Sequence, residues 1–479
     1  MTATTMNPDS FEQRLDNSRL TRTMWLLWLL SAGLIALDGF DFFIIGVAIP
    51  FLQRDFGLDA TTVGAVATAA VVGALVGSLT LGPLTDRVGR QRMLIVDVII
   101  FVIATAGTAL AWNAASLIVF RFWVGVGIGA DYPISVAYIT ENVPARLRGR
   151  MVIGAFTFQA VGALLGALTG LVTIHLFRVV YPDPDPMAIQ YAWRWMLGVG
   201  VGLALLVAIA RLSFSLESPR YYINRGEYAQ ASAAATQLLA TPMTITAAME
   251  PPKSQEQPTY GVLFNQHHRR STLLASLPWF LQDIATYGVG IFTPVIIAML
   301  ALGEETDFLV REMGAAKGAA LVDLFLILGF ICALVLVDKL GRIRLQIVGF
   351  LGMAVGLSIL AAADSFTAGS QSEIALVLLG FVVFNLMMNA GPNATTFLLS
   401  GEVFPTAIRA TGAGFAAAFA KAGAVIGTFL LPILQTSWGV PQMLISLAMC
   451  CILAAAITAS FRIETMGKSL EAVQELQLE

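Results

Sequence analysis

Charge is scarce in this chain of 479 residues, since 12% are Asp, Glu, Lys or Arg whereas 57% are hydrophobic. A soluble fold of this length cannot bury that much apolar surface, so the composition excludes a soluble globular protein. It indicates a polytopic membrane protein instead. The formal net charge of −3 carries little information, because in a membrane protein the positions of the basic residues matter more than their sum.

Cysteine and histidine are also rare, with three of each. Cys332, Cys450 and Cys451 all fall in apolar runs, which excludes a disulfide framework and a thiolate metal site. The sequence has no nucleophile and base, no cluster of metal ligands and no phosphate-cradling loop beside a soluble domain. We therefore expect a protein that is not an enzyme, that needs no cofactor or metal, and that does not bind nucleic acid.

Long apolar runs dominate what is present. Twelve of them approach the roughly 20 residues that a helix needs to cross a bilayer. They lie at 24–50, 61–84, 93–112, 115–140, 151–176, 191–214, 271–302, 314–337, 343–363, 373–400, 408–436 and 439–462. The first continues beyond Asp38 and Asp41, so it predicts a full span rather than a cleaved signal peptide. We expect an all-α membrane protein with twelve transmembrane helices and both termini on one side.

The basic residues predict which side that is. If the N-terminus is inside, the Lys and Arg residues that face outside are five: Arg54, Arg178, Arg194, Arg311 and Lys317. Arg121 and Lys421 fall within spans, and the other 21 of the 28 basic residues face the cytoplasm. The positive-inside rule therefore favours cytoplasmic termini. Abundant alanine and short tails favour the bacterial inner membrane as the plasma membrane concerned.

Repeated loop motifs divide the chain. DRVGR at 86–90 returns 252 residues later as DKLGR at 338–342, and Glu-x-x-Pro-x-x-x-Arg at 141–148 returns 261 residues later at 402–409. A duplication predicts an N-terminal six-helix half (1–214), a cytoplasmic linker (215–270) that is helical around 226–239 and otherwise loose, and a C-terminal half (271–479). The residues expected to latch an inward gate are Asp86, Arg90, Glu141, Arg148, Asp338, Arg342, Glu402 and Arg409.

Several polar residues stand at membrane depth. Asp38 and Asp41 are three apart and share one face of the first span, so at least one of these close carboxylates is expected to hold a proton near neutrality. Trp279, Asp283 and Tyr287 follow one another at a spacing of four, which places them on one stripe of the seventh span.

Other polar residues occupy equivalent places in the two halves. Asp131 and Asn393 are 262 residues apart, as are Gln159 and Lys421. Equivalent helices thus contribute polar groups at nearly equal depth, which predicts a shared site at the midplane between the halves. Asn385 and Asn389, taken alone, are equally explained by ordinary hydrogen bonds between helices.

The paired loops, with ESPR at 217–220 and GEVFPT at 401–406, resemble the major facilitator superfamily and its sugar-porter-like branch. The resemblance covers essentially the whole chain and implies two pseudo-symmetric six-helix halves that work by alternating access. The loops do not select a substrate.

The intramembrane residues resemble more narrowly the phosphate:proton symporters of this superfamily. That resemblance implies a monomer in membrane lipid that binds protons and a small anion. It implies phosphate held by Tyr132, Gln159, Trp279, Asp283, Tyr287 and Asn393, and proton coupling by Asp38, Asp41, Asp131 and Lys421. Two positions depart from the family, Ala130 in place of a glycine and Thr140 in place of a serine.

The chemistry of these side chains is compatible with phosphate. Hydroxyl, indole, amide and ammonium groups supply donors for an oxyanion, whereas a sugar site would need more amides and less fixed charge. Asp283 can accept a hydrogen bond from the P–OH of a protonated phosphate. For coupling, we expect Asp131 and Lys421 to pair across the halves when the site is empty, and protonation of Asp131 or Asp41 to weaken that pair. A proton symporter for a small organic acid or other metabolite, a sugar transporter and a non-transporting sensor remain the alternatives.

Overall fold

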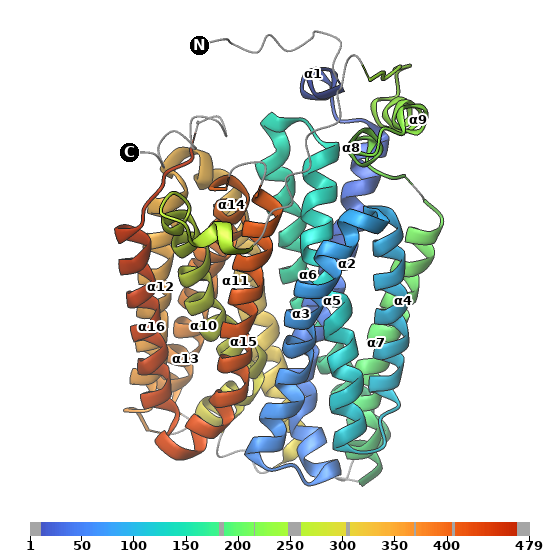
Figure 1. Cartoon of the computed structure of the whole chain (residues 1–479). Helices are drawn as coiled ribbons and strands as arrows, with labels where there is room; N and C mark the ends of the chain where they lie inside the picture. The colour runs from blue at the N-terminus through green and yellow to red at the C-terminus, as the bar shows by residue number, and fades with distance from the viewer. Residues whose placement is uncertain are drawn as a thin grey trace.

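The computed structural model describes residues 11–181, 186–214, 216–247, 260–302, 307–367, 370–404 and 408–466, and within these ranges the regular structure is helical throughout (Figure 1). The long helices are α2 (Arg22–Phe56), α3 (Ala60–Val88), α4 (Arg90–Ala109), α5 (Ala114–Asn142), α6 (Ala145–Val180), α7 (Pro186–Leu212), α10 (Arg269–Ala301), α11 (Phe308–Leu340), α12 (Arg342–Ala363), α13 (Gln371–Ala390), α14 (Pro392–Glu402), α15 (Arg409–Trp438) and α16 (Val440–Ser460). Each predicted apolar run falls on one of these helices, the tenth on α13 and α14 together.

The membrane-crossing character of these helices follows from their length and composition. Eleven helical stretches of the described chain are long and apolar enough to span a bilayer, and α5 adds the shorter apolar stretch Ala114–Gly129. Many large apolar side chains of the bundle are exposed, Ile103 at 64% and Leu206 at 66% among them. Exposure of that kind suits a surface that faces lipid rather than water.

Local signals set the helix ends. Thr21 accepts a hydrogen bond from the N–H of Met24 at the start of α2, and Asp307 does the same for Val310 at the start of α11. Gly57 ends α2 in the left-handed conformation, with a φ of 62°, where glycine meets no steric penalty. These caps satisfy backbone groups that the apolar surroundings could not.

The tenth membrane crossing is broken between α13 and α14. Pro392 has no N–H and begins the new helix, and Gly391 between the helices has φ −120° and ψ −99°. Gly391 also lies so close to Gly349 of α12 that a Cβ added to it would sit 2.7 Å from the Gly349 Cα. The break places Asn393 in the first turn of α14, one turn after Asn389 at the end of α13.

The helices form two groups that match the predicted halves. Helices α2 to α7 pack mainly on one another, as do α10 to α16, and the groups meet where α6 packs on α11, α3 on α15 and α2 on α10. Figure 1 shows the two groups side by side, with their helices running along the long axis of the bundle. This packing is what a division into residues 1–214 and 271–479 requires, and the exact boundaries stay a prediction.

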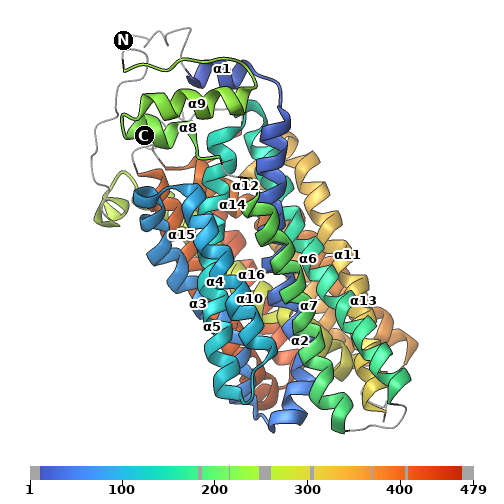
Figure 2. The same cartoon turned by 90° about the vertical axis from the view of Figure 1, so that its right-hand side faces the viewer.

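The short helices gather at one end of the bundle, called here the α1 end (Figure 2). They are α1 (Phe11–Asn17), α8 (Pro219–Asn224), α9 (Tyr228–Leu239) and the 3₁₀ helix η1 (Tyr260–Phe264). Helix α9 confirms the helix predicted around 226–239, whereas α8 and η1 were not predicted. Residues 248–259 of the linker lie outside the described ranges. Thr21 Oγ1 donates a hydrogen bond to the Leu238 carbonyl at 2.7 Å, which ties the linker to the start of α2.

Candidate transport site

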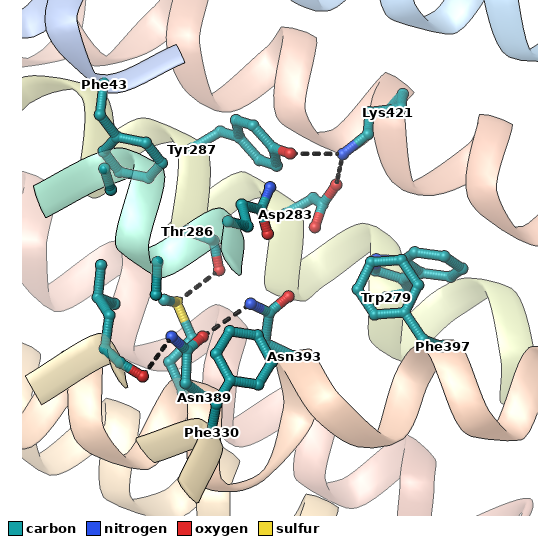
Figure 3. A pocket seen from close by; sticks show the side chains of 15 residues that line it. Phe43, Trp279, Asp283, Thr286, Tyr287, Phe330, Asn389, Asn393, Phe397 and Lys421 are labelled. Atoms are coloured by element: carbon teal, nitrogen blue, oxygen red, sulfur yellow. Dashed lines mark hydrogen bonds and ion pairs between the residues drawn. The ribbon is translucent and has the colours of Figure 1, made fainter. Parts of the chain in front are cut away.

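A small cavity lies between the two groups of helices (Figure 3). Its volume is about 30 Å³. One buried water needs about 10–15 Å³, so the cavity has room for only about two or three water molecules. It is therefore nearly closed in this conformation. The structure brings together six residues that were predicted to share a midplane site: Gln159, Trp279, Asp283, Tyr287, Asn393 and Lys421.

Lys421 of α15 is the cation of this cavity. Its Nζ donates hydrogen bonds to Asp283 Oδ2 at 3.0 Å and to the Tyr287 hydroxyl at 2.8 Å, both on α10 (Figure 3). The predicted pair between Asp131 and Lys421 is not formed here, because Lys421 meets Asp283 on the helix against which α15 packs. Asp131 instead accepts a hydrogen bond from Ser135 Oγ at 2.7 Å.

Asn393 belongs to a chain of buried amides. Gln282 Nε2 donates to Asn393 Oδ1 at 3.0 Å, Asn393 Nδ2 donates to Asn389 Oδ1 at 2.7 Å, and Asn389 Nδ2 donates to the Leu326 carbonyl at 3.0 Å. The second Nδ2 hydrogen of Asn393 can still donate to a substrate without breaking these bonds. Gln282 was missed in the sequence, although it is a fully buried glutamine beside Asp283.

A second buried ion pair lies in the first group of helices. Arg121 of α5 is fully buried, and its Nη1 lies 3.0 Å from Asp41 Oδ2 of α2. The sequence placed Arg121 within a span but named no partner for it, since the two residues are 80 positions apart. Neither Asp41 nor Asp38 is among the residues that line the cavity, and both lie in the neighbouring interior of the first group.

Asp38 and Asp131 share that interior with two residues that sequence analysis did not select. Asp97 of α4 is 2% exposed and Arg211 of α7 is fully buried. Arg211 lies within electrostatic range of Asp131 and Asp97. Arg211 was counted among the cytoplasmic residues because it stands near the end of its apolar run. Its burial is set by packing between α4, α5 and α7, which the run itself does not reveal.

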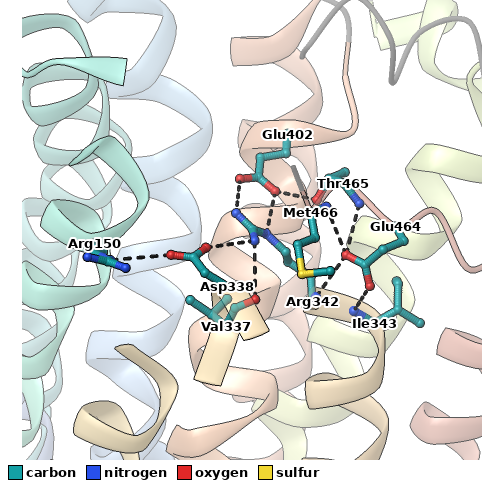
Figure 4. A network of polar contacts seen from close by, with 9 residues as sticks. All are labelled: Arg150, Val337, Asp338, Arg342, Ile343, Glu402, Glu464, Thr465 and Met466. Carbon is teal, nitrogen blue, oxygen red and sulfur yellow. Dashed lines mark hydrogen bonds and ion pairs between the residues drawn. The ribbon is translucent and has the colours of Figure 1, made fainter. Parts of the chain in front are cut away.

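The α1 end carries a polar network on the second group (Figure 4). Arg342 donates through Nε and Nη2 to the two carboxylate oxygens of Glu402, each at 3.1 Å, and through Nη1 to Asp338 at 3.2 Å. Asp338 in turn lies 3.4 Å from Arg150 of α6, in the other group. The predicted gate residues Asp338, Arg342 and Glu402 are thus in contact, and Arg150 extends them across the interface.

Both groups cap a helix at this end with a glutamate. Glu464 accepts hydrogen bonds from the N–H groups of Arg342 and Ile343 at 3.0 and 3.1 Å, and Glu217 accepts one from Gln91 at 3.0 Å. Carboxylates are stabilised at helix N-termini, where free N–H groups point outward. Glu464 was missed, although it follows Glu217 by nearly the same interval as the other repeated motifs.

Other predicted residues are less completely described. Glu141 and Arg148 lie within electrostatic range of each other. The side chains of Tyr132, Asp86, Arg90 and Arg409 lie outside the described part of the chain. Their roles stay predictions.

Comparison with known proteins shows the family to which this chain belongs. The family model described as sugar (and other) transporter matches residues 28–476. The chain belongs to this transporter family. Its relatives include the "Putative metabolite transport protein YaaU" of Escherichia coli, 28% identical over 93% of both chains, and the "Low affinity inorganic phosphate transporter 4" of Medicago truncatula, 29% identical over 82% of this chain and 80% of the relative.

Solved structures give the fold of this transporter. The xylose transporter XylE of Escherichia coli, in a partially occluded inward open conformation, matches with a TM-score of 0.74 and 22% identity, covering 94% of this chain and 100% of XylE. The predicted all-α, twelve-helix major facilitator fold is confirmed. The protein is a multi-pass membrane transporter rather than an enzyme, as predicted.

The gate network makes a measurable prediction for this transporter. Glu402→Gln removes one charge from the bidentate pair with the buried Arg342, so Asp338 is drawn away from Arg150 and the α1 end opens. The Arg150–Asp338 pair that this change weakens is exposed and contributes about 0–1 kcal/mol, so we expect the open population to rise by at most about fivefold. Spin labels at the exposed Arg92 and Arg344, in the first turns of α4 and α12, report the opening as a longer distance.

Arg150→Gln tests the same contact directly. It removes the cation that Asp338 meets across the interface, where the two side chains are 62% and 46% exposed. We expect it to open the α1 end about as far as Glu402→Gln does, and a wild-type distance in both variants would contradict the gate.

Proposed function

We propose that this transporter imports inorganic phosphate together with protons by alternating access. The observation that carries the proposal is the buried Lys421 held between Asp283 and Tyr287 in the cavity between the halves. An ammonium, a hydroxyl and the Trp279 indole offer donors to an oxyanion, while the carboxylate offers an acceptor to its P–OH. The plant relatives named as inorganic phosphate transporters support the same substrate.

The balance of charge at this site favours binding of phosphate together with a proton. Lys421 and Asp283 nearly neutralise each other while they are paired, so an arriving anion adds one uncompensated charge to a buried site. Entry of a proton together with the anion removes that excess. In this scheme Gln159, Asn393 and Tyr132 complete the set of polar groups around the anion.

Proton coupling is assigned to Asp41, with Asp38 and Asp131 beside it. Protonation of Asp41 removes the counter-charge of Arg121, and the buried ion pair then no longer holds α2 against α5. Because α2 also packs on α10, which carries Asp283, a change in α2 reaches the substrate site through direct packing. The proton thus biases which end of the bundle opens.

The proposed setting is the bacterial inner membrane, with a single chain as the working unit and the α1 end in the cytoplasm. The excess of Lys and Arg at the α1 end favours this orientation. The gate of Asp338, Arg342 and Glu402 then closes the inward route. Substrate enters from the opposite end.

Asp283→Asn tests the role of the acceptor. Near neutrality phosphate still carries a P–OH proton, whereas sulfate does not, so the Asp283 carboxylate should favour phosphate and repel sulfate. We expect phosphate transport by the variant to fall but stay measurable and its discrimination to erode, so that sulfate competes in phosphate counterflow by at least about tenfold more than in the wild type. Unchanged rejection of sulfate by an active variant would contradict this role.

A small organic acid or other metabolite is the second candidate. Three aromatic rings, those of Phe43, Phe330 and Phe397, line the cavity and could hold an apolar substituent beside a carboxylate (Figure 3). The relative named as a metabolite transport protein matches over a larger share of both chains than the phosphate transporter does.

The deciding experiment is uptake of radiolabelled phosphate into proteoliposomes with an imposed inward proton gradient. Protonophore-sensitive accumulation that resists unlabelled organic acids and sugars is expected. Absence of accumulation by a folded preparation would overturn the phosphate proposal. Strong competition by one organic acid would identify the second candidate.

A further inference from the structure

A second cavity lies next to the substrate cavity, further toward the opposite end of the bundle. Its volume is about 10 Å³, which is room for about one water molecule. Phe43 of α2 and Ala163 of α6 line both cavities. On each helix that lines both cavities, the residues that line only the second cavity lie nearer the end of the bundle opposite the α1 end. They are Val47 on α2, Ala167 on α6, Pro294 on α10 and Ala319 on α11. The second cavity therefore stands on the side of the substrate site that faces the opposite end.

Asp323 of α11 lines this second cavity and is 6% exposed. Among the residues that the structure describes, no hydrogen bond or ion pair reaches its carboxyl group. The rest of the wall combines the apolar side chains of Phe43, Val47 and Ala167 with polar atoms that carry no charge. An ionised carboxylate without a cation is far costlier in such a place than a neutral carboxyl group.

The polar atoms that accompany Asp323 are oxygens. Thr293 lines the cavity and donates its hydroxyl hydrogen to the Val289 carbonyl at 3.0 Å, so toward any other group its Oγ1 can only accept a hydrogen bond. Pro294 has no N–H, and the carbonyl of Gly290 four residues earlier therefore lacks its usual helical donor. A cavity with three kinds of acceptor oxygen requires a hydrogen to be supplied. A protonated Asp323 supplies one, and a single water can supply two more.

A bare metal cation fits this set of oxygens less well. Hard cations take about six to eight oxygen ligands, whereas this wall offers a carboxyl group, one hydroxyl and one carbonyl, with space for a single water. A proton needs no such shell.

The charged groups of the surrounding helices either contact other residues or lie away from the second cavity. Helices α6 and α10 present alanine, glycine, threonine and proline to the cavity, and α2 presents Phe43 and Val47. The titratable residues elsewhere on the helices that pack against α11, and on α11 itself, are Arg22, Asp38, Asp41, Arg54, Asp55, Arg269, Arg270, Asp283, Tyr287, Arg311, Glu312, Lys317, Cys332, Asp338, Lys339, Arg342, Arg344, Glu373 and Glu402, with His175 and the basic residues at the two ends of α6. None of these lines the second cavity.

We propose that Asp323 is a second proton-binding site of this transporter, loaded from the opposite end of the bundle and separated from the substrate cavity by the ring of Phe43. The ring is held against α10 because Gly290 has no side chain, and a Cβ added there would meet Phe43 at 2.8 Å. Movement of Phe43 would join the two cavities. The Asp323 proton would then enter the substrate site with the anion, giving one coupled proton beyond that of Asp41. This inference rests on the proposed proton-coupled transport.

The first test needs no substrate. Infrared difference spectra of the full-length protein in liposomes, recorded on pH steps, should contain a carbonyl band of a buried protonated carboxyl group that Asp323→Asn removes. The control Asp364→Asn changes an exposed carboxyl group just after the end of α12 and should keep the band. A spectrum that Asp323→Asn leaves unaltered would overturn the proposal, as would a band that sodium ions abolish at constant pH and ionic strength.

The second test counts protons, with phosphate as the probe. At zero membrane potential, loss of one proton per cycle lowers the accumulation ratio about tenfold for each unit of imposed pH gradient, while phosphate counterflow persists. An unaltered ratio in Asp323→Asn would overturn the coupling role even if the infrared band is lost. If the wild type does not carry phosphate at all, the infrared test still decides whether Asp323 binds a proton.

Thr293→Val provides a second test of the Asp323 site if Asp323→Asn does not fold. This variant retains the carboxyl group and the side-chain volume but removes one acceptor oxygen. We expect the infrared band to titrate at a different pH and the accumulation ratio to stay the same. A titration identical to that of the wild type would show that Asp323 does not share the cavity's oxygens as proposed.

Discussion

Lys421→Met is expected to abolish phosphate transport and to destabilise the protein. The substitution leaves Asp283, which is 2% exposed, without the cation that lies 3.0 Å from it. Removing one partner of a buried ion pair typically costs about 3–5 kcal/mol, because the remaining charge is left uncompensated. The variant also loses the ammonium donor that we assign to the anion, so both binding and folding suffer.

A double substitution separates these two effects. Lys421→Met combined with Asp283→Asn removes both charges, so the melting temperature should recover most of its loss while transport stays absent. Lys317→Met serves as the control, since Lys317 is an exposed lysine near the start of α11. Thermal unfolding in detergent and phosphate counterflow are the two measurements. Counterflow by Lys421→Met at the wild-type rate would contradict a role for Lys421 in binding.

The sequence predicts the fold of this protein well because bilayer thickness constrains it. A span needs about 20 apolar residues, so runs such as 314–337 are recognised without knowledge of their neighbours. The repeated loops add the pseudo-symmetry, since DRVGR and DKLGR return at an interval that only a duplication explains. These signals are local or periodic, which is why they can be read along the chain.

The pairing of charges was predicted less well. Lys421 was expected to meet Asp131 but meets Asp283, and Arg121 was left without a partner although it meets Asp41. Partners of this kind lie 138 and 80 residues apart, and which carboxylate a buried cation meets depends on helix packing and rotation. Neither hydrophobic periodicity nor offset between the halves contains that information.

The same reason explains the site residues that the sequence did not select. Gln282 and Asp323 are polar residues within apolar runs, so both can be recognised in the sequence. Their significance comes from what faces them: the amide of Asn393 in one case and a wall without a cation in the other. The sequence located the polar groups, and the packing decides which of them act together.

Asp41→Asn is expected to weaken the driving force of transport without stopping transport. An amide in place of the carboxyl group cannot take up the proton assigned to Asp41, so an imposed proton gradient does less work on the substrate. The accumulation ratio should fall about tenfold for each unit of imposed pH gradient, while exchange of phosphate across the membrane continues. Proteoliposomes with an imposed proton gradient measure the first quantity, and counterflow without a gradient measures the second.

The buried Arg121 complicates this variant, because Asp41→Asn leaves a guanidinium without its counter-charge. Destabilisation of about 3–5 kcal/mol is expected, and Arg121→Gln added to Asp41→Asn should relieve it without restoring accumulation. Asp55→Asn is the matched control on the same helix, since Asp55 pairs with Arg194 at 3.1 Å near the opposite end, where both side chains are partly exposed. An accumulation ratio that stays at the wild-type value in Asp41→Asn but falls to about one in Asp323→Asn would transfer the coupling step to the second cavity, because a proton gradient can drive accumulation only through a group that still binds the proton.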